Sequence, residues 1–150
     1  MKRILVVSPT PTHPAIAGNR ACILSYVELL KSLGNDVYFF WVVNPVYSDE
    51  DFKETQKYWG QHFFYYKKNI AHRILEFLFK RLRFGLTGYY KVDDMFPFGI
   101  ERKARWLQRQ FCFDVVIVNY VYLSKVFKFF RNSKKVLFTH DVFTNKYQKH

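Results

Sequence analysis

The sequence predicts an α/β fold in which an open parallel sheet carries helices on both faces. Short apolar runs rich in β-branched and aromatic residues, typical of buried parallel strands, recur along the 150 residues. Stretches with apolar residues at spacings of three and four alternate with these runs, as expected for helices that connect parallel strands. The length suits one domain, and a hydrophobic content of 49% is enough for its core.

A proline-rich loop separates the first expected strand from the first expected helix. The strand is the apolar run Ile4–Val7, and three prolines follow it: Pro9, Pro11 and Pro14. Because proline removes backbone donors and restricts the residue before it, Ser8–Gly18 is expected to be irregular. Asn19 can cap the helix that follows, and Gly34 supplies a left-handed stop. The loop therefore lies at the carboxyl end of the first strand, where open parallel sheets bind ligands.

The remaining elements alternate in the same way. We expect strands over Val37–Val43, Gln61–Tyr66, Val115–Val118 and Lys135–Thr139. We expect helices over Ser48–Trp59, Asn69–Phe84, Ile100–Phe111 and Tyr122–Phe130. Ser48 is placed to cap its helix, and a long loop is expected over Gly85–Gly99, where no clean period is found.

The composition indicates a cytoplasmic protein. No apolar run approaches the ~18 residues of a spanning helix, and the run before Pro9 is too short for a signal peptide. Cys22 and Cys112 lack a CxxC or Cys-His neighbour, so we expect two buried free thiols rather than a disulfide or a metal site. No metal and no cofactor are expected.

The positive charge of the chain is unevenly distributed. The formal net charge is +12, yet residues 1–60 carry equal numbers of basic and acidic side chains, so the excess belongs to the last ninety residues. Such a balance favours an anionic partner, either nucleic acid, a phospholipid surface or a phosphorylated substrate. Zinc-ligand spacing, a recognition-helix unit and an aromatic-basic RNA-binding pattern are all absent, so no nucleic-acid partner is expected.

The expected helix Asn69–Phe84 is amphipathic, with a wide apolar face. One interpretation is an ordinary helix whose apolar face packs on the sheet. The other is a peripheral helix at an anionic membrane surface, because bulky apolar residues stand beside a basic cluster. That cluster comprises Lys67, Lys68, Arg73, Lys80, Arg81 and Arg83.

The sequence contains neither the glycine fingerprint of dinucleotide-binding folds nor a P-loop. Four segments, in order along nearly the whole chain, instead resemble the amino-terminal half of family-four retaining glycosyltransferases of the GT-B fold. The segments are Arg3–Val7 with its proline loop, Ala17–Arg20 opening a helix that ends at Leu33-Gly34-Asn35-Asp36-Val37, Phe113–Tyr120, and Lys135–Asp141. The resemblance implies a Rossmann-like acceptor-binding domain of an enzyme that builds cell-surface polysaccharides or glycolipids.

The resemblance also implies site residues and partners. Gly18, Asn19 and Arg20 would bind substrate together with Asn119 and Tyr120. His140 would hydrogen-bond the transferred sugar or an acceptor hydroxyl, and Asp141 would orient His140. A nucleotide-sugar donor and a sugar or lipid-linked acceptor would be the substrates. Each polar residue has a structural alternative: Asn19 as a helix cap, Arg20 as a surface charge and His140 as a strand-end histidine bonded to backbone.

The chain departs from the family in two respects. The usual Gly-Gly of the first loop is Ala17-Gly18, which leaves less room for the approach of a ligand. The second Rossmann-like domain, which holds the nucleotide-sugar through two glutamates eight positions apart, has no counterpart here. We therefore expect residues 1–150 to form a single acceptor-side domain that is inactive alone. The alternative from another class is a non-catalytic, basic nucleic-acid-binding α/β domain.

Overall fold

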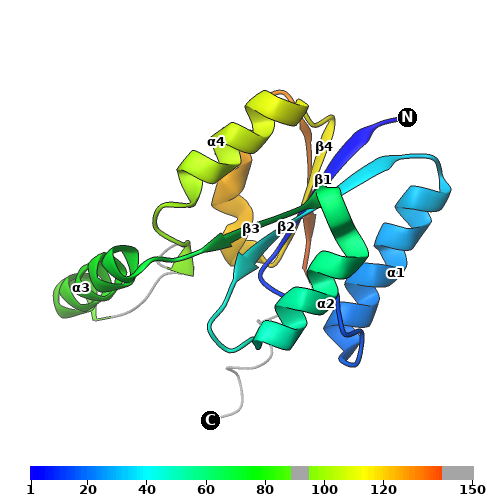
Figure 1. The fold of residues 1–150 in the computed structure, drawn as a ribbon. Coiled ribbons are helices and arrows are strands. Elements are labelled where there is room, and N and C mark those ends of the chain that lie inside the picture. Colours follow the sequence, from blue (N-terminus) through cyan, green and yellow to red (C-terminus); the bar gives the residue numbers. More distant parts are fainter. Residues whose placement is uncertain (89–94, 140–150) are drawn as a thin grey trace, which may run out of the picture.

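A computed structural model describes residues 1–88 and 95–139, and within them five parallel strands form one open sheet (Figure 1). The strands are β1 (Arg3–Ser8), β2 (Asp36–Val43), β3 (Phe63–Lys67), β4 (Val115–Asn119) and β5 (Lys134–Phe138). Their order across the sheet is β3-β2-β1-β4-β5, so the chain moves outward from β1 in one direction and then in the other. The predicted Rossmann-like α/β class is confirmed.

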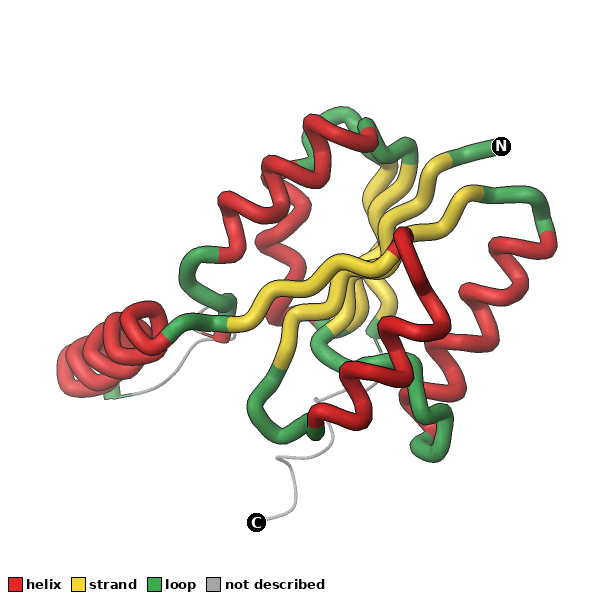
Figure 2. Tube along the Cα trace, in the orientation of Figure 1, coloured by secondary structure: helices red, strands yellow, loops and turns green. Residues whose placement is uncertain are grey.

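Helices cover both faces of this sheet (Figure 2). One face carries α1 (Gly18–Ser32) and α2 (Asp49–Trp59), and the other carries α4 (Ile100–Phe111) and the 3-10 helix η3 (Val121–Phe129). A short 3-10 turn, η1 (Gly60–His62), joins α2 to β3, and α3 (Ile70–Thr87) projects from the carboxyl end of β3. None of the helices in the described residues has the length and apolar content needed to cross a bilayer.

Two separate cores follow from the alternation of side chains along the strands. Leu5, Val7 and Phe40 point to the α4 side, where they pack with Leu107 and Leu123. The intervening side chains point to the opposite side and pack with α1 and α2. The main members of that second core are Ile4, Val6, Phe39, Trp41, Ile23, Val27 and Trp59. Since β1 and β2 are buried on both faces, their apolar runs are continuous.

Several local predictions are confirmed and several are wrong. Ser48 caps α2 as expected, and Gly34 ends α1 with φ +76°. Asn19 is not a cap, because α1 begins one residue earlier and Ala17 occupies the cap position without a side-chain bond. The free cysteines Cys22 and Cys112 are exposed rather than buried. The helix expected to end at Phe84 continues for three further residues, because the glycine at 85 is tolerated within it.

The orientation of α3 is opposite to that of an ordinary surface helix. Several of its polar side chains face the domain: Glu76 is buried and accepts hydrogen bonds from Lys68 and Lys80, both at 2.7 Å. The ring of His72 lies 3.0 Å from the Tyr66 hydroxyl, which also donates to the carbonyl oxygen of Phe98. The apolar side chains of α3 face solvent. Of the two interpretations of this helix, packing of its apolar face on the sheet is therefore wrong.

Gly99 permits this arrangement at the start of α4. Its φ is +84°, and a Cβ there would meet the His72 ring and the Tyr66 hydroxyl. Gly34 has a similar φ of +76°, but a Cβ there would meet nothing within 4 Å. The two glycines thus share a left-handed backbone and differ in crowding.

We predict that Gly34→Ala costs about 1 kcal/mol of unfolding free energy, because only the backbone is strained. Gly99→Ala should cost about 2–3 kcal/mol, since overpacking against His72 and Tyr66 adds to the same strain. Urea denaturation of both variants measures the difference. Equal losses would show that the contact between Gly99 and α3 is loose.

Candidate functional site

The carboxyl ends of β1 and β4 form the switch point of this sheet, which is where ligands bind in open parallel sheets. The two strands are neighbours, and the chain leaves them toward opposite faces, into α1 and η3 respectively. At such a reversal the loops diverge and leave a crevice outside the strand ends. The structure brings four of the predicted substrate-binding residues to this place: Gly18, Asn19, Asn119 and Tyr120.

Asn119 is fully buried at the end of β4 and joins three elements. Its Nδ2 donates to the carbonyl oxygen of Val7 at 3.2 Å and to the Tyr26 hydroxyl at 2.8 Å. That hydroxyl lies 3.1 Å from Oδ1 of the same amide. Burial raises the pKa of Tyr26 well above its ordinary value, so its hydroxyl stays protonated. Asn119 therefore connects β4 to β1 and α1 at the switch point.

Tyr120 and Asn19 contact each other at the switch point. Tyr120 has a φ of +72°, uncommon for a side chain of this size, and it is only partly buried. Its hydroxyl accepts a hydrogen bond of 3.3 Å from Nδ2 of Asn19. The Oδ1 of Asn19 accepts from the backbone N–H of Arg20 at 2.9 Å. Asn19 thus links the first turn of α1 to the end of β4.

Gly18 begins α1, one residue before Asn19. It is exposed, and a Cβ added there would contact nothing within 4 Å. No side chain caps the helix, since Ala17 stands at the cap position. The positive end of the α1 dipole at Gly18 therefore suits an anionic group, while the amide of Arg20 is already bound to Asn19.

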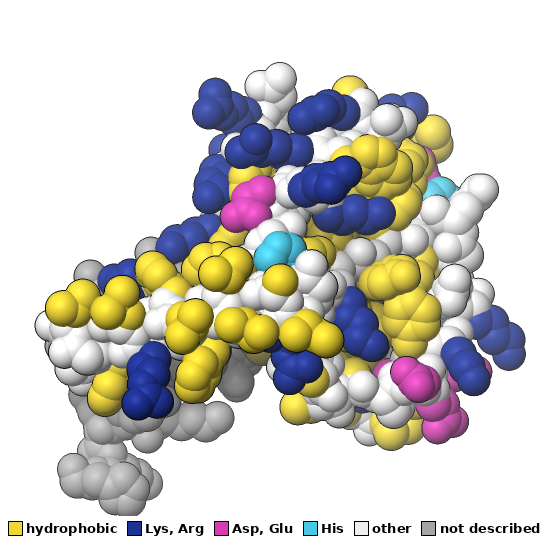
Figure 3. All heavy atoms as spheres, turned by 60° about the vertical axis from the view of Figure 1, so that its left-hand side comes forward, with side chains coloured by type: hydrophobic (Ala, Val, Ile, Leu, Met, Phe, Trp, Pro, Cys, Tyr) yellow, Lys and Arg dark blue, Asp and Glu magenta, His cyan; other side chains and the backbone are white. Residues whose placement is uncertain are grey.

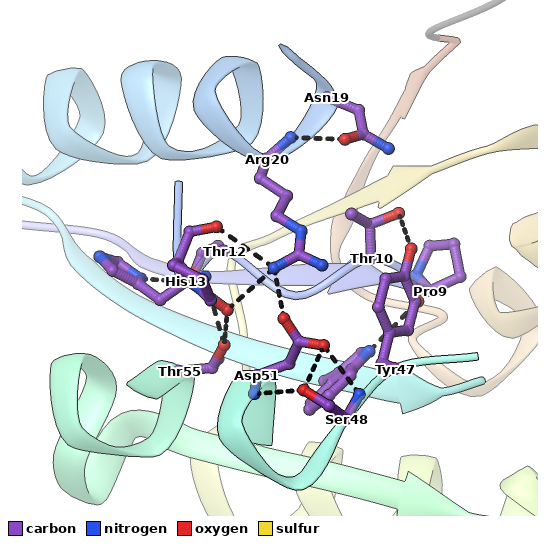
Figure 4. A network of polar contacts seen from close by, with 12 residues as sticks. Pro9, Thr10, Thr12, His13, Asn19, Arg20, Tyr47, Ser48, Asp51 and Thr55 are labelled. Atoms are coloured by element: carbon purple, nitrogen blue, oxygen red, sulfur yellow. Dashed lines mark hydrogen bonds and ion pairs between the residues drawn. The ribbon is translucent and has the colours of Figure 1, made fainter. Parts of the chain in front are cut away.

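Arg20 has a different environment from that predicted. It neither faces the crevice nor stands free on the surface, because its side chain is only 11% exposed and pairs with Asp51 of α2 at 2.5 Å. The same Nη1 donates to the carbonyl oxygens of Pro14 and His13, at 3.2 and 3.4 Å (Figure 4). Arg20 therefore ties the loop to α2, and these contacts give it a positioning role.

Residues that sequence reasoning missed complete the attachment of this loop. Trp41 Nε1 donates to the Pro9 carbonyl oxygen at 3.1 Å, and Trp59 Nε1 donates to Thr12 Oγ1 at 2.8 Å. Thr55 Oγ1 donates to the carbonyl oxygen of His13 at 3.2 Å. The Ser48-x-x-Asp51 capping box was visible in the sequence as a signal, but its contact with Arg20 joins residues 31 positions apart.

His13 is a second group that the sequence did not single out. Its ring stacks on Tyr58 with centroids 4.2 Å apart, and its Nδ1 lies 3.0 Å from Thr12 Oγ1. Burial lowers the pKa of His13 below its ordinary value, so the ring is neutral at physiological pH. It packs the loop against α2 and carries no charge toward a ligand.

The remaining predicted residues divide into three groups. His140 and Asp141 lie outside the described residues. Lys68 and Lys80 are engaged with Glu76 and do not project freely toward a membrane. Exposed side chains are found at Lys67, Arg73 and Arg81, and Arg83 is partly buried. Within residues 1–88 and 95–139, no group of three His, Cys, Asp or Glu side chains is arranged to hold a metal ion.

Comparison with known proteins gives no relative: no family model, curated protein or solved structure matches the chain.

The Arg20–Asp51 pair generates a prediction about acid stability. Burial alone would raise the pKa of Asp51, but hydrogen bonds from Ser48 and Arg20 outweigh it and hold that pKa below the ordinary 3.8. A carboxylate with a lowered folded pKa stabilises the fold above the unfolded pKa and loses that contribution as pH falls through the folded value. Asp51→Asn should cost about 3 kcal/mol at neutral pH.

This difference between wild type and Asp51→Asn should shrink as the pH falls below 3.8, and denaturant titrations at several pH values measure it. Asp49→Asn on the same turn is the control, because Asp49 is exposed and should show a small loss. A difference that stays constant down to about pH 2 would contradict the stabilising role of the ionised pair.

Proposed function

We propose that this chain is the acceptor-side domain of a sugar-nucleotide-dependent glycosyltransferase that acts in cell-surface polysaccharide or glycolipid synthesis. The observation that carries the proposal is the juxtaposition at the switch point of β1 and β4, where the exposed Gly18 at the start of α1 stands beside the Asn19–Tyr120 hydrogen bond. An open helix start suits a phosphate, and neighbouring amide and phenol groups suit sugar hydroxyls.

Each residue at the switch point has a role in this proposal. The backbone at Gly18 approaches the anionic group, which no side chain at that position obstructs. Asn19 and Tyr120 exchange their mutual hydrogen bond for bonds to a sugar, and Asn119 holds the ends of β4 and β1 together. Arg20 keeps the loop in place through Asp51. His140 and Asp141 are the proposed catalytic pair, by their position in the motif that resembles the family.

The donor sugar nucleotide would be held by a second α/β domain with two glutamates eight positions apart. Residues 1–150 alone should therefore transfer no sugar when mixed with UDP- or GDP-sugars and candidate acceptors. Robust turnover by these residues would refute the half-enzyme account. The coding sequence beyond His150 gives an independent check, because it should encode such a domain.

We predict that Gly18→Val in the complete enzyme lowers kcat/KM about tenfold or more, because a branched side chain keeps the ligand from the backbone and misplacement by about 1 Å can cost ~100-fold. The fold should stand, since the space around Gly18 is empty. Steady-state kinetics and thermal unfolding separate the two effects. Gly18→Ala, with a smaller side chain, should give an intermediate rate, and unchanged kinetics in both variants would reduce the loop to a connector.

We also propose that α3 holds the domain at an anionic membrane surface. Its outward side chains are 42–78% exposed: Ile70, Ile74, Leu75, Phe77, Leu78, Phe79, Leu82, Phe84 and Leu86. A contiguous apolar surface of this kind is uncommon on a soluble monomer and marks an interaction site. We call these nine side chains the α3 ridge. The exposed basic residues Arg73 and Arg81 accompany it.

The charge of the chain favours a membrane over a second copy as the partner of the α3 ridge. Two copies would bring net charges of +12 together, whereas an anionic leaflet attracts each basic residue by roughly 1 kcal/mol. Burial of one large apolar side chain contributes ~1.5–3 kcal/mol. Insertion of a few ridge residues therefore outweighs the electrostatic part, and lipid-linked acceptors would be reached from this surface.

We predict that the chain floats with vesicles containing phosphatidylglycerol and that Ile74→Ser with Leu78→Ser abolishes flotation. Both side chains are exposed, so the fold should be unaffected. Leu29→Ser in α1 with Leu33→Ser at its C-cap is the matched control, because these leucines are at least as exposed but lie at another helix. Wild type that stays in the soluble fraction at low salt would refute membrane attachment without bearing on the switch point.

A further inference from the structure

Three arginines of α4 line a wide groove beside the start of α3. Arg102, Arg105 and Arg109 are spaced by three and four residues, so they share one side of the helix. The groove has a volume of about 750 Å³. Its lining comprises Asn69, His72, Gly99, Glu101, Arg102, Arg105, Trp106 and Arg109. We call Arg102, Arg105 and Arg109 the arginine row.

The arginine row is not neutralised within the part of the chain that the structure describes. No ion pair there includes any of the three guanidinium groups, and Glu101 is the one acidic side chain in the described lining of the groove. A second groove of about 550 Å³ adjoins the row at Arg105 and includes Lys128 and Arg131. Such a surface attracts an anionic partner, because its positive charges add.

Trp106 adds an apolar group to the arginine row. It lies one residue after Arg105 and is 41% exposed, whereas Trp41 and Trp59 are only 1% and 3% exposed. The ammonium of Lys103 lies 4.3 Å from the centre of its ring. A partly exposed indole flanked by cations is typical of side chains at the water–lipid boundary, where the ring sits at headgroup level.

The arginine row and the α3 ridge are presented on one face of the domain. Figure 3 shows basic side chains over α4 directly beside the apolar side chains of α3. The groove itself joins the two helices, since Asn69 and His72 at the start of α3 belong to its lining. Both surfaces are therefore in view from one side of the domain.

We propose that the arginine row binds the phosphates of anionic lipid headgroups in the leaflet that receives the α3 ridge. This inference rests on the proposed membrane attachment and adds its lipid selectivity. Guanidinium groups suit phosphate because they donate two parallel hydrogen bonds, which an ammonium does not. A nucleic acid would satisfy the arginines but would leave the neighbouring ridge in water, so the leaflet fits both surfaces.

The test uses Trp106 as a local reporter. Because the other two tryptophans are buried, quenching by brominated lipids should act on Trp106 and be lost in Trp106→Phe. Vesicles of phosphatidylcholine with and without phosphatidylglycerol are titrated against wild type and Arg102→Gln/Arg105→Gln/Arg109→Gln. Each lost charge should weaken binding to the anionic vesicles about fivefold, and all three about 100-fold.

The matched control is Lys2→Gln/Lys53→Gln/Lys57→Gln, which removes three exposed charges from positions outside the groove. It should weaken binding far less than the arginine variant. Equal effects of the two variants would show a general charge effect and overturn the arginine row, while membrane attachment through the ridge would stand. Failure of wild type to bind anionic vesicles would overturn both. Binding of an oligonucleotide at physiological salt, without binding to vesicles, would assign the row to nucleic acid instead.

Discussion

The position of the proline-rich loop beside the carboxyl end of β1 depends on the ion pair between Arg20 and Asp51. Both side chains are nearly buried, at 11% and 12% exposure, and a buried charge is tolerated only when its hydrogen-bonding groups find partners. Here the carboxylate is bound by Ser48 and Arg20, and the guanidinium also binds two carbonyl oxygens of the proline-rich loop. The pair thus couples the cap of α2, the loop and α1 in one network.

This coupling explains how a loop with three prolines can hold one shape. Prolines remove donors, so the carbonyl oxygens of the loop need partners from elsewhere. The donors come from indole, hydroxyl and guanidinium groups on β2, α2 and α1, among them Trp41, Thr55 and Arg20. Gly18 consequently stands at a fixed position beside the end of β4, which an irregular loop without such anchors would not provide.

The fold was predictable because its strands and helices carry local signals. The apolar runs of β1 and β4 and the glycine at 34 each specify their own element, and alternation then gives the parallel sheet. The site was predictable only in part. Gly18, Asn19, Asn119 and Tyr120 lie together in the structure because all four follow strand ends or begin a helix, and the strand order then brings them to one place. The pairing of Arg20 with Asp51 was not predictable, because the two residues are 31 positions apart.

The direction of α3 could not have been read from its period. Hydrophobic periodicity identifies two faces but does not say which one meets the domain. That choice is made by Glu76, which satisfies two lysines at 2.7 Å, and by the contact between His72 and Tyr66. Cys22 and Cys112 illustrate the same limit, since an apolar residue type on a helix or at its end does not fix its burial.

The inverted arrangement of α3 divides its residues into those that affect the stability of the fold and those that do not. Substitutions in the α3 ridge remove little buried surface, so they leave the folded population nearly unchanged. Substitutions at Glu76 or Gly99 disturb the attachment of the helix itself. Under the proposed membrane attachment, the apolar character of the ridge would be maintained by selection on that contact, and in a set of related chains its variation would track the partner rather than the domain.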